Sequence, residues 1–432
     1  MSDLRDPHID SERLWTDIMA LGGLTEPDAP YTRRSFSPMF LNGREWLSRR
    51  FADAEMAVRL DAGGNLIGRL PGADPMAGTI MIGSHSDSVP SGGRFDGMAG
   101  VAAAIEIVRA LRDAGRVMNH AIEVVDFLAE EPSEFGLSCV GSRAMAGRLP
   151  DDMLAYRNAA GETLGAAIDR VGGDVADIAR AARDDIACFL ELHIEQGRVL
   201  EDTNINLGIV TAIASVTRVE IQFEGRADHA GTTPMHLRRD AGLGAATTIA
   251  FVAAEAERRA QLDRGHFVAT TGVVTLSPNA ANVIPGHARL IVDIRAEDDD
   301  LLEGFLANLD AQTLATAQAM RLERVSWKIL SRTRPAHCDP QLRKLLGESA
   351  RSLGYTVLDM ASGAGHDTAF MSTIAPSGMV FVPCLEGRSH TPEEWATPEA
   401  IAAGAETMLE AVMRFDAGLH PTNRTSTQGA RQ

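Results

Sequence analysis

Several common catalytic motifs are missing from this chain of 432 residues. Lysine is almost absent: only Lys328 and Lys344 occur, and neither follows a GxxxxG loop, so the phosphate-binding loop of nucleotide hydrolases is excluded. Neither lysine lies in a motif that supports Schiff-base chemistry. No GxSxG nucleophile elbow occurs either, so the hydrolases built on that motif are not indicated.

Cysteine, long apolar runs and basic charge are also scarce. The cysteines form no CxxC pair, so neither a zinc ribbon nor a thioredoxin-like redox site is supported, and we expect buried, reduced thiols. No apolar run approaches the roughly 20 residues that a membrane helix needs. The net charge of −18 argues against binding to nucleic acid or to an anionic membrane, because no basic surplus is available for phosphate groups. The acidic N-terminal segment lacks the layout of a secretory signal, and we expect a cytoplasmic protein.

Strand and helix patterns alternate in the first half of the chain. Residues 79–84, 121–128 and 185–192 are predicted to be buried strands, and 97–114 a helix with its apolar residues at helical spacing. Such alternation predicts βαβ units and a largely parallel sheet.

The pattern changes near residue 212. We expect strands at 216–223, 267–276, 288–295 and 324–330, and helices at 240–259 and 301–320. This β-α-β-β-α-β order is the ferredoxin-like arrangement. The α/β pattern then resumes, with helices at 340–353 and 398–415 and strands near Tyr355 and Met379.

These patterns together predict an α/β fold with two domains. A mixed, mainly parallel sheet flanked by helices would form the catalytic domain, in two parts at 10–211 and 333–417. A ferredoxin-like α+β domain at 212–332 would be inserted between them. Residues 418–432 are polar and without periodicity, and we predict a disordered tail.

Potential metal ligands stand near the ends of five separate segments of this pattern: His85, Asp96, Glu131, His193 and His390. In an open α/β sheet, ligands gather outside the carboxyl ends of the strands. Three histidines and two carboxylates at that edge would form a plausible pocket for two divalent metals.

Adjacent carboxylates at a strand end can have two different roles. Because neighbours on a strand point to opposite sides, Glu131 could bind a metal while Glu130 takes a proton from water as general base. Asp87 could orient the ring of His85 from outside the ligand set. Each feature has a simpler interpretation when taken alone: the glutamate pair could be an exposed acidic turn, Asp96 a helix N-cap, and each histidine structural.

The segments around these residues resemble the dimetal amidohydrolases related to zinc aminopeptidases and aminoacylases. That resemblance rests on GSHSDSVP at 83–90, GGRFDG at 92–97 and Glu130-Glu131. The N-carbamoyl-L-amino acid hydrolase and allantoate amidohydrolase branch is indicated by further segments: ELHIEQG at 191–197, GRADHAGTTPM at 225–235, PNAANVIPG at 278–286, SGAGHD at 362–367 and SHT at 389–391. The resemblance covers nearly the whole chain between the tails.

The resemblance implies a role for each of the potential ligands. His85 and Glu131 would belong to opposite metal sites bridged by Asp96, and His193 and His390 would complete the two sites. Glu130 would be the general base, and Asp87 would support His85. Zinc is the expected metal, and this ligand set suits manganese, cobalt or nickel as well.

The resemblance also implies a set of substrate-binding residues: Gln196, His229, Asn282, Arg295, Gly365 and His366. His229 would help to polarise the scissile carbonyl, Asn282 and Arg295 would hold the substrate carboxylate, and Gln196 would contact its ureido or carboxylate end. Taken alone, Arg295 could be a surface ion-pair partner, His229 could pair with Asp228, and His366 could cap a helix. The inserted domain would act as the lid and as the dimerisation surface of a homodimer.

We therefore predict a metal-dependent enzyme that hydrolyses the carbamoyl C–N bond of an N-carbamoyl-L-amino acid, giving the amino acid, ammonia and carbon dioxide. Allantoate, β-ureidopropionate or another ureido acid is the alternative substrate, and a metallo-dipeptidase or aminoacylase is the alternative enzyme. A metal-binding protein on a retired catalytic fold is a third alternative, against which the presence of Glu130 argues. Glu134 stands where most carbamoyl-amino-acid enzymes would have Arg, and this exchange of charge could change the substrate preference.

Overall fold

The computed structural model describes residues 6–262 and 264–419, which divide into two compact units. The first unit contains the chain up to Thr211, the segment His337–Asp359 and the chain from His366 onward. The second contains Ala212–Ala336 and Met360–Gly365. The chain thus leaves the first unit, builds the second and then returns.

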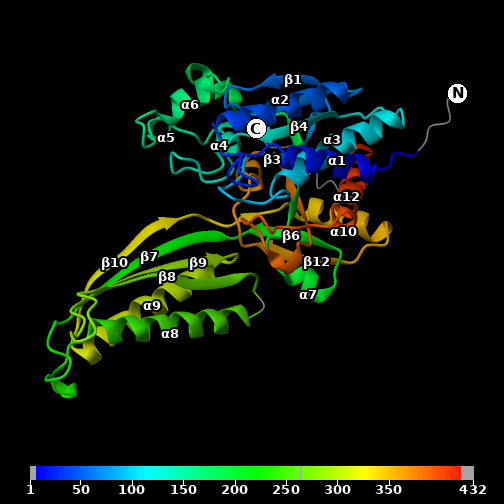
Figure 1. Ribbon diagram of the computed structural model, residues 1–432. Helices are drawn as coiled ribbons and strands as arrows, with labels where there is room; N and C mark the ends of the chain where they lie inside the picture. The colour runs from blue at the N-terminus through cyan, green and yellow to red at the C-terminus, as the bar shows by residue number, and fades with distance from the viewer. Residues whose placement is uncertain (1–5, 263, 420–432) are drawn as a thin grey trace, which may run out of the picture. The chain divides into compact units, whose positions relative to one another are not determined.

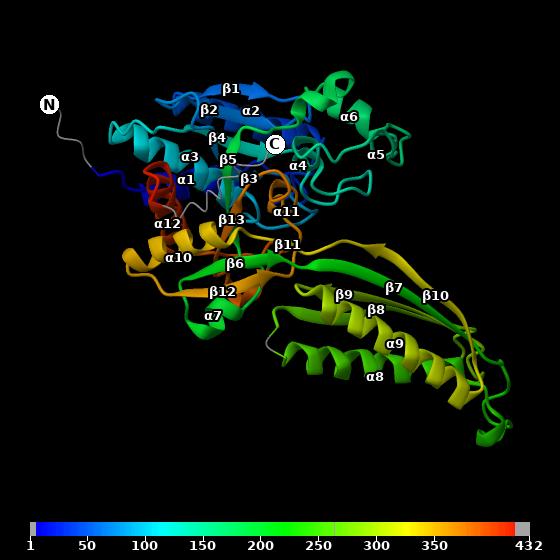
Figure 2. The same cartoon turned by 180° about the vertical axis from the view of Figure 1, so that it is seen from behind.

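The large sheet has the strand order β1-β2-β4-β3-β5-β13-β6-β11, and β12 pairs with β6 (Figure 1 and Figure 2). The strands are β1 (Ala57–Leu60), β2 (Leu66–Leu70), β3 (Thr79–His85), β4 (Ala121–Phe127), β5 (Ile186–Ile194), β6 (Leu207–Ile213), β11 (Ala336–His337), β12 (Val357–Ser362) and β13 (Ser377–Val382). The central strands β4, β3, β5 and β13 are parallel to one another, whereas β2 pairs antiparallel with β4 and β6 pairs antiparallel with β13. The predicted mixed, mainly parallel sheet is confirmed.

The central strands are buried on both faces, and side chains along β3 alternate between two hydrophobic cores. Ile80 and Ile82 join the core under one layer of helices, and Met81 joins the core on the other face. The first layer contains α1 (Ser11–Gly22), α2 (Pro38–Asp53), α3 (Met98–Asp113), α10 (Pro340–Ser352) and α12 (Pro398–Asp416). The second face is covered by α4 (Val140–Met145) and α11 (Thr368–Met371). Full burial of each such side chain contributes about 1.5–3 kcal/mol, which fixes the register of the strand.

Shorter elements complete the first unit: α5 (Asp151–Leu154), α6 (Leu164–Arg170), α7 (Val199–Thr203) and the 3-10 helices η1 (Val175–Ala181) and η3 (Leu385–Gly387). Several longer helices begin where the sequence provides a capping side chain followed by proline. Asp339 caps α10 before Pro340, and Thr397 caps α12 before Pro398. Proline fits the first helical position because its missing N–H would have no partner there.

The second unit has the element order β-α-β-β-α-β, and its sheet order is β10-β7-β9-β8, antiparallel throughout. Its elements are β7 (Ser215–Glu224), the 3-10 helix η2 (Met235–Leu237), α8 (Ala241–Ala260), β8 (Phe267–Ser277), β9 (His287–Ala296), α9 (Asp299–Met320) and β10 (Glu323–Arg332). The helices α8 and α9 cover one face of this sheet (Figure 2). Every second residue of β9, including Leu290, Val292 and Ile294, is fully buried in the core beneath them. The predicted ferredoxin-like unit is confirmed.

Some regular elements lie where the sequence patterns predicted none, notably α1, α2, β1, β2 and β6. Within the part of the chain that the structure describes, no helix combines the length and the apolar character required to cross a membrane. Most of the predicted tail, residues 420–432, lies outside the described residues.

Candidate metal centre

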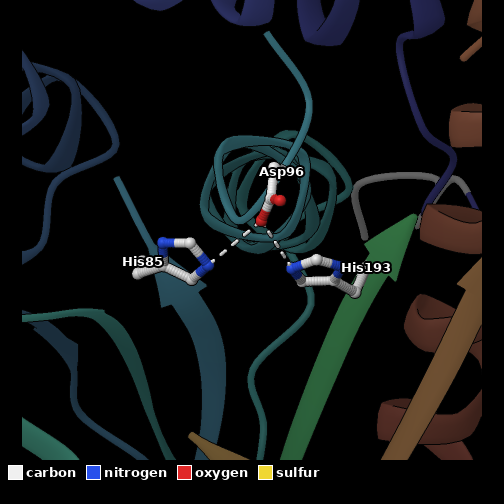
Figure 3. A group of neighbouring side chains, drawn as sticks. All are labelled: His85, Asp96 and His193. Carbon is white, nitrogen blue, oxygen red and sulfur yellow. Dashed lines mark ion pairs between the residues drawn. The ribbon is translucent and has the colours of Figure 1, made fainter. Parts of the chain in front are cut away.

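Several of the predicted metal ligands lie at one edge of the large sheet, at or just after the ends of its central strands. His85 is the last residue of β3, His193 lies near the end of β5, and Glu131 follows β4. Asp96 lies just before α3, and Figure 3 shows the rings of His85 and His193 pointing toward its carboxylate from two sides. The carboxyl ends of parallel neighbours share one edge, which explains why residues distant in sequence meet here.

The first ligand group consists of His85, Asp96 and His193, all buried. Oδ1 of Asp96 lies 3.4 Å from Nε2 of His85 and 3.1 Å from Nε2 of His193. Ligand atoms about 2.1 Å from a tetrahedral ion would lie roughly 3.4 Å apart. The spacing of this group therefore fits a single divalent ion.

The hydrogen bonds of the two rings show which nitrogen of each ring is left to face Asp96. Nδ1 of His85 lies 3.1 Å from the carbonyl oxygen of Asp87, and Nδ1 of His193 lies 2.9 Å from the carbonyl oxygen of Ile194. Because a carbonyl only accepts, each Nδ1 carries a proton, so Nε2 is the nitrogen of each ring that could bind a metal ion once it is deprotonated. Among the residues that the structure describes, the buried Nε2 of His85 has no hydrogen-bond partner. Two imidazole nitrogens and a carboxylate oxygen that face one point are the ligand types that divalent metals bind.

The second group consists of Asp96, Glu131 and His390, and it shares Asp96 with the first. Nε2 of His390 lies 3.2 Å from Oδ2 of Asp96 and 3.3 Å from Oε1 of Glu131. The two oxygens of Asp96 thus serve different groups, as a bridging carboxylate requires. Asp96 is not a helix cap, since Gly97 is the N-cap of α3, and the interpretation of Asp96 as a cap is wrong.

Glu130 lies beside both groups and belongs to neither. Its Oε2 is 3.7 Å from Nε2 of His85, and its Oε1 accepts a hydrogen bond of 3.4 Å from the thiol of Cys139. Glu130 and Glu131 are 7% and 5% exposed, so the interpretation of this pair as an exposed acidic turn is wrong. A buried carboxylate that is not committed to a ligand group is available for proton transfer.

Asp87 supports the glutamate pair through its side chain and His85 through its backbone. The carboxylate oxygens of Asp87 accept the N–H groups of Glu130 and Glu131, each at 3.2 Å. The nearest contact of this carboxylate with Nδ1 of His85 is longer, at 3.6 Å. The ring is therefore oriented by the Asp87 carbonyl, a partner that the sequence could not distinguish from the carboxylate.

The charged groups of the site shift one another's protonation. Burial raises the pKa of the Glu130 carboxyl well above its ordinary value, and burial also raises the pKa of Glu131. Burial opposes ionisation of Asp96 too, but hydrogen bonds with His193 and His390 hold its pKa well below the ordinary value. Two hydrogen bonds raise the pKa of His390 to about 10: the bond with Asp96 has the larger effect, and the bond with Glu131 the next largest. The clustered carboxylates therefore favour positive charge at this edge of the sheet.

Of the predicted substrate-binding residues in the first unit, Gln196 and His366 lie against the ligand groups. Nε2 of Gln196 donates to Oδ2 of Asp96 at 2.8 Å and to the hydroxyl of Ser389 at 3.2 Å. The ring of His366 is buried, with its centroid 4.5 Å from that of His193, and burial lowers its pKa well below the ordinary value. The direct contact of Gln196 with a ligand was not predicted, and the predicted substrate contacts of both residues stay predictions.

The remaining predicted substrate-binding residues, His229, Asn282, Arg295 and Gly365, lie in the second unit. Nδ1 of His229 accepts the N–H groups of Gly231 at 3.0 Å and Thr232 at 3.2 Å. The proton of the neutral ring is therefore on Nε2, and the side chain is exposed. His229 and Val283 form an isolated bridge, which places His229 next to the segment carrying Asn282.

Arg295 forms the ion pair that its simpler interpretation predicted. Its Nε donates to Asp293 at 2.7 Å, and its Nη1 donates to the carbonyl of Gly363 at 3.0 Å. Asp228 is paired with Arg226 at 2.6 Å rather than with His229. The ion pair with Asp293 orients the guanidinium group of Arg295. The predicted contact of Arg295 with the substrate stays a prediction.

Sequence patterns missed a group of polar residues behind the ligands. Glu191 accepts hydrogen bonds from the hydroxyls of Ser84 at 2.7 Å and Thr368 at 2.5 Å, and it links two strands of the sheet to α11. Glu394 is buried and contacts the segment that carries Asp96. Their local sequence contains no signal for these roles, because the partners are distant along the chain. Glu134, where an arginine was expected, is exposed, and its effect on substrate preference stays a prediction.

The fold and the paired ligand groups agree with the comparisons to known proteins. Residues 81–414 match peptidase family M20/M25/M40, and the chain belongs to this family of hydrolases. The chain is similar to the N-carbamoyl-L-amino acid amidohydrolase of Geobacillus stearothermophilus, with 38% identity over 416 residues that cover 95% of this chain and 100% of that protein. It is similar to the ureidoglycolate hydrolase of Oryza sativa subsp. japonica, with 33% identity that covers 94% of this chain and 85% of that protein.

A solved structure supports the same relationship. The amidase of the hydantoinase/carbamoylase family from Burkholderia multivorans is 35% identical to this chain. The two structures superpose with a TM-score of 0.87, and the match covers 94% of this chain and 98% of that one. The predicted membership of the carbamoylase branch is confirmed.

Proposed function

We propose that this protein is a metal-dependent amidohydrolase that cleaves the carbamoyl C–N bond of an N-carbamoyl-L-amino acid. The products would be the amino acid, ammonia and carbon dioxide. The observation that carries the proposal is a pair of ligand groups sharing Asp96, with the uncommitted Glu130 beside them. Similarity over the full length of the Geobacillus stearothermophilus amidohydrolase supports this choice of substrate.

The ligand residues would hold two divalent ions: His85, Asp96, Glu131, His193 and His390. The ions, when bound, would supply the Lewis acidity that makes water a usable nucleophile near neutral pH. Zinc is the proposed metal, and manganese, cobalt or nickel would suit the same ligands.

Glu130 would act as general base and then as general acid. It would take the proton from the attacking water and deliver it to the leaving nitrogen. The carboxylate of Asp87 accepts the backbone N–H of Glu130 and would hold the backbone of Glu130 in place during both proton transfers.

The predicted substrate-binding residues would each have a role in holding the substrate. His229 would donate from Nε2–H to the carbonyl oxygen as negative charge develops there, in agreement with the hydrogen bonds at its Nδ1. Arg295 and Asn282 would bind the substrate carboxylate, for which the planar fork of arginine is suited. We assign Gln196 to the ureido end of the substrate and Gly365 and His366 to the pocket wall.

We also propose that the protein is a homodimer joined through the second unit. The strand β8 is an edge of its sheet, and Val268, Val273 and Val274 on it are 43%, 38% and 45% exposed. An exposed apolar edge strand is a template for pairing with a second chain. Analytical ultracentrifugation of the full chain tests this: a monomer at micromolar concentration would contradict the proposal.

Another ureido acid is the second candidate substrate, because the chain is also similar to a ureidoglycolate hydrolase. The deciding experiment measures ammonia release from N-carbamoyl amino acids, ureidoglycolate, allantoate and β-ureidopropionate, with dipeptides and N-acetyl amino acids run beside them. The proposal expects the highest kcat/KM on an N-carbamoyl-L-amino acid. A higher kcat/KM on another ureido acid would change the substrate, and amino-acid release from dipeptides or N-acetyl amino acids without ammonia would indicate a peptidase or aminoacylase.

A further inference from the structure

Glu394 is a fully buried carboxylate that belongs to neither ligand group. Its Oε1 accepts the backbone N–H groups of Phe95 at 2.8 Å and of Asp96 at 3.1 Å. Its Oε2 lies 3.0 Å from the hydroxyl oxygen of Ser389. Glu394 therefore connects the segment of the bridging ligand Asp96 with the residue that precedes the ligand His390.

The hydroxyl of Ser389 extends this connection to the Asp96 side chain. It lies 3.1 Å from Oδ2 of Asp96, the same oxygen that accepts the amide of Gln196. Since Gln196 also donates to the Ser389 oxygen, the single Ser389 proton is left to bond either Asp96 or Glu394. The backbone and the side chain of Asp96 are thus held by one connected set of hydrogen bonds.

The backbone at Gly93 gives a second, independent observation of the close contact between Glu394 and the segment that carries Asp96. A Cβ atom at Gly93 would overlap the carboxylate of Glu394, so the backbone passes against Glu394 with no room for a side chain. The neighbouring Glu393 contrasts with it, because Glu393 is exposed and its carboxylate accepts a hydrogen bond from the hydroxyl of Thr391.

We propose that Glu394 is a positioning residue that holds Asp96 in the orientation needed to bridge the two ligand groups. This inference rests on the proposed metal-dependent function, and it assigns to Glu394 no contact with metal or substrate. Partners behind metal ligands alter metal affinity by about 10–100-fold when they are removed. Displacing the Glu394 oxygens should therefore weaken metal binding at both groups at once, because both depend on Asp96.

Three substitutions separate the position of the oxygens from their charge. Glu394→Gln keeps an oxygen for the two N–H groups and can donate to Ser389, so metal affinity should stay within a few-fold of the parent. Glu394→Asp keeps the charge but withdraws the oxygens by one methylene, and Glu394→Ala removes them; both should lose about 10–100-fold in affinity. Glu393→Ala is the matched control and should bind metal as the parent does.

The measurement is zinc affinity and stoichiometry of the full-length apo-protein in competition with a chromophoric chelator. The absorption spectrum of the cobalt-substituted protein reports the ligand geometry, and thermal unfolding followed by circular dichroism shows which variants fold. Glu394→Asp with parental affinity and cobalt spectrum would overturn the proposal, as would equal losses in the Gln and Asp variants. If the Ala variant does not fold, the Gln and Asp pair still decides.

The same data keep the proposed function separate. A parent that binds two zinc ions and hydrolyses no ureido acid would refute the proposed substrate and leave the Glu394 result standing. If the parent hydrolyses a ureido acid and the Glu394→Asp variant binds metal as tightly as the parent, only the positioning role of Glu394 would be refuted.

Discussion

Replacing Glu130 with glutamine should abolish hydrolysis while both metal sites remain filled. Glu130 belongs to neither ligand group, and its Oε2 lies 3.7 Å from Nε2 of the ligand His85. Glutamine has the same shape and can still accept the hydrogen bond from Cys139, so the buried pocket keeps its packing. The substitution removes only the capacity to take a proton.

The size of the effect follows from the two proton transfers assigned to Glu130. General acid–base catalysis contributes about 10²–10⁴-fold. Because the same carboxylate would serve both the attacking water and the leaving nitrogen, we expect a loss of kcat of about 10³–10⁴-fold, or roughly 4–5.5 kcal/mol in the barrier. KM should change little, since Glu130 is not assigned to substrate binding.

The assay combines steady-state ammonia release with metal content measured by elemental analysis. The matched control is Glu131→Gln, which alters a ligand of the second group and should lower metal content as well as rate. A Glu130→Gln variant that retained a tenth or more of the parental kcat would show that Glu130 is not the base. Loss of metal from that variant would show that Glu130 is a ligand instead.

Further predictions concern the metals and the stability of the second unit. Treatment with a chelator should abolish ammonia release and added zinc or manganese should restore it; activity that survives metal removal would refute the account. Glu255→Ala should lower the free energy of unfolding, measured in urea, by about 3 kcal/mol, because it leaves the buried Arg259 without its carboxylate partner, 2.8 Å away. The control is Glu257→Ala: Glu257 is exposed on the same helix, and its loss should change the free energy of unfolding by less than about 0.5 kcal/mol. A hydrogen bond with Arg258 lowers the pKa of Glu255 to about 2 from an ordinary 4.5, so its stabilisation is complete above pH 4.5 and is lost as the pH falls toward 2. Equal acid sensitivity of the parent and Glu255→Ala would contradict this.

The sequence predicted best those elements whose apolar residues repeat at a regular period. The continuous apolar runs of β3 and β4 and the alternation along β9 placed these strands within one or two residues of their observed bounds. The strands β1 and β2 were missed because they are short and partly exposed, so their periodicity is weak. Their place at one side of the large sheet depends on antiparallel pairing, which no local pattern encodes.

The candidate site was predictable where it depended on strand ends. His85 and His193 meet because parallel neighbours end at one edge, a consequence of topology that can be inferred from alternating strands and helices. The hydrogen bonds that prepare the site were not predictable in this way. Glu394 lies 298 residues from Asp96 and next to Glu393, from which the sequence does not distinguish it, and only the tertiary structure shows which of the two is buried.

The most direct test of the central claim is a zinc titration of the apo-protein, followed by ammonia release from an N-carbamoyl-L-amino acid. The account predicts that activity rises until two equivalents per chain are bound, because two ligand groups share Asp96. It also predicts one ammonia molecule for each amino acid released. Full activity at zero equivalents, or amino-acid release without ammonia, would contradict the account.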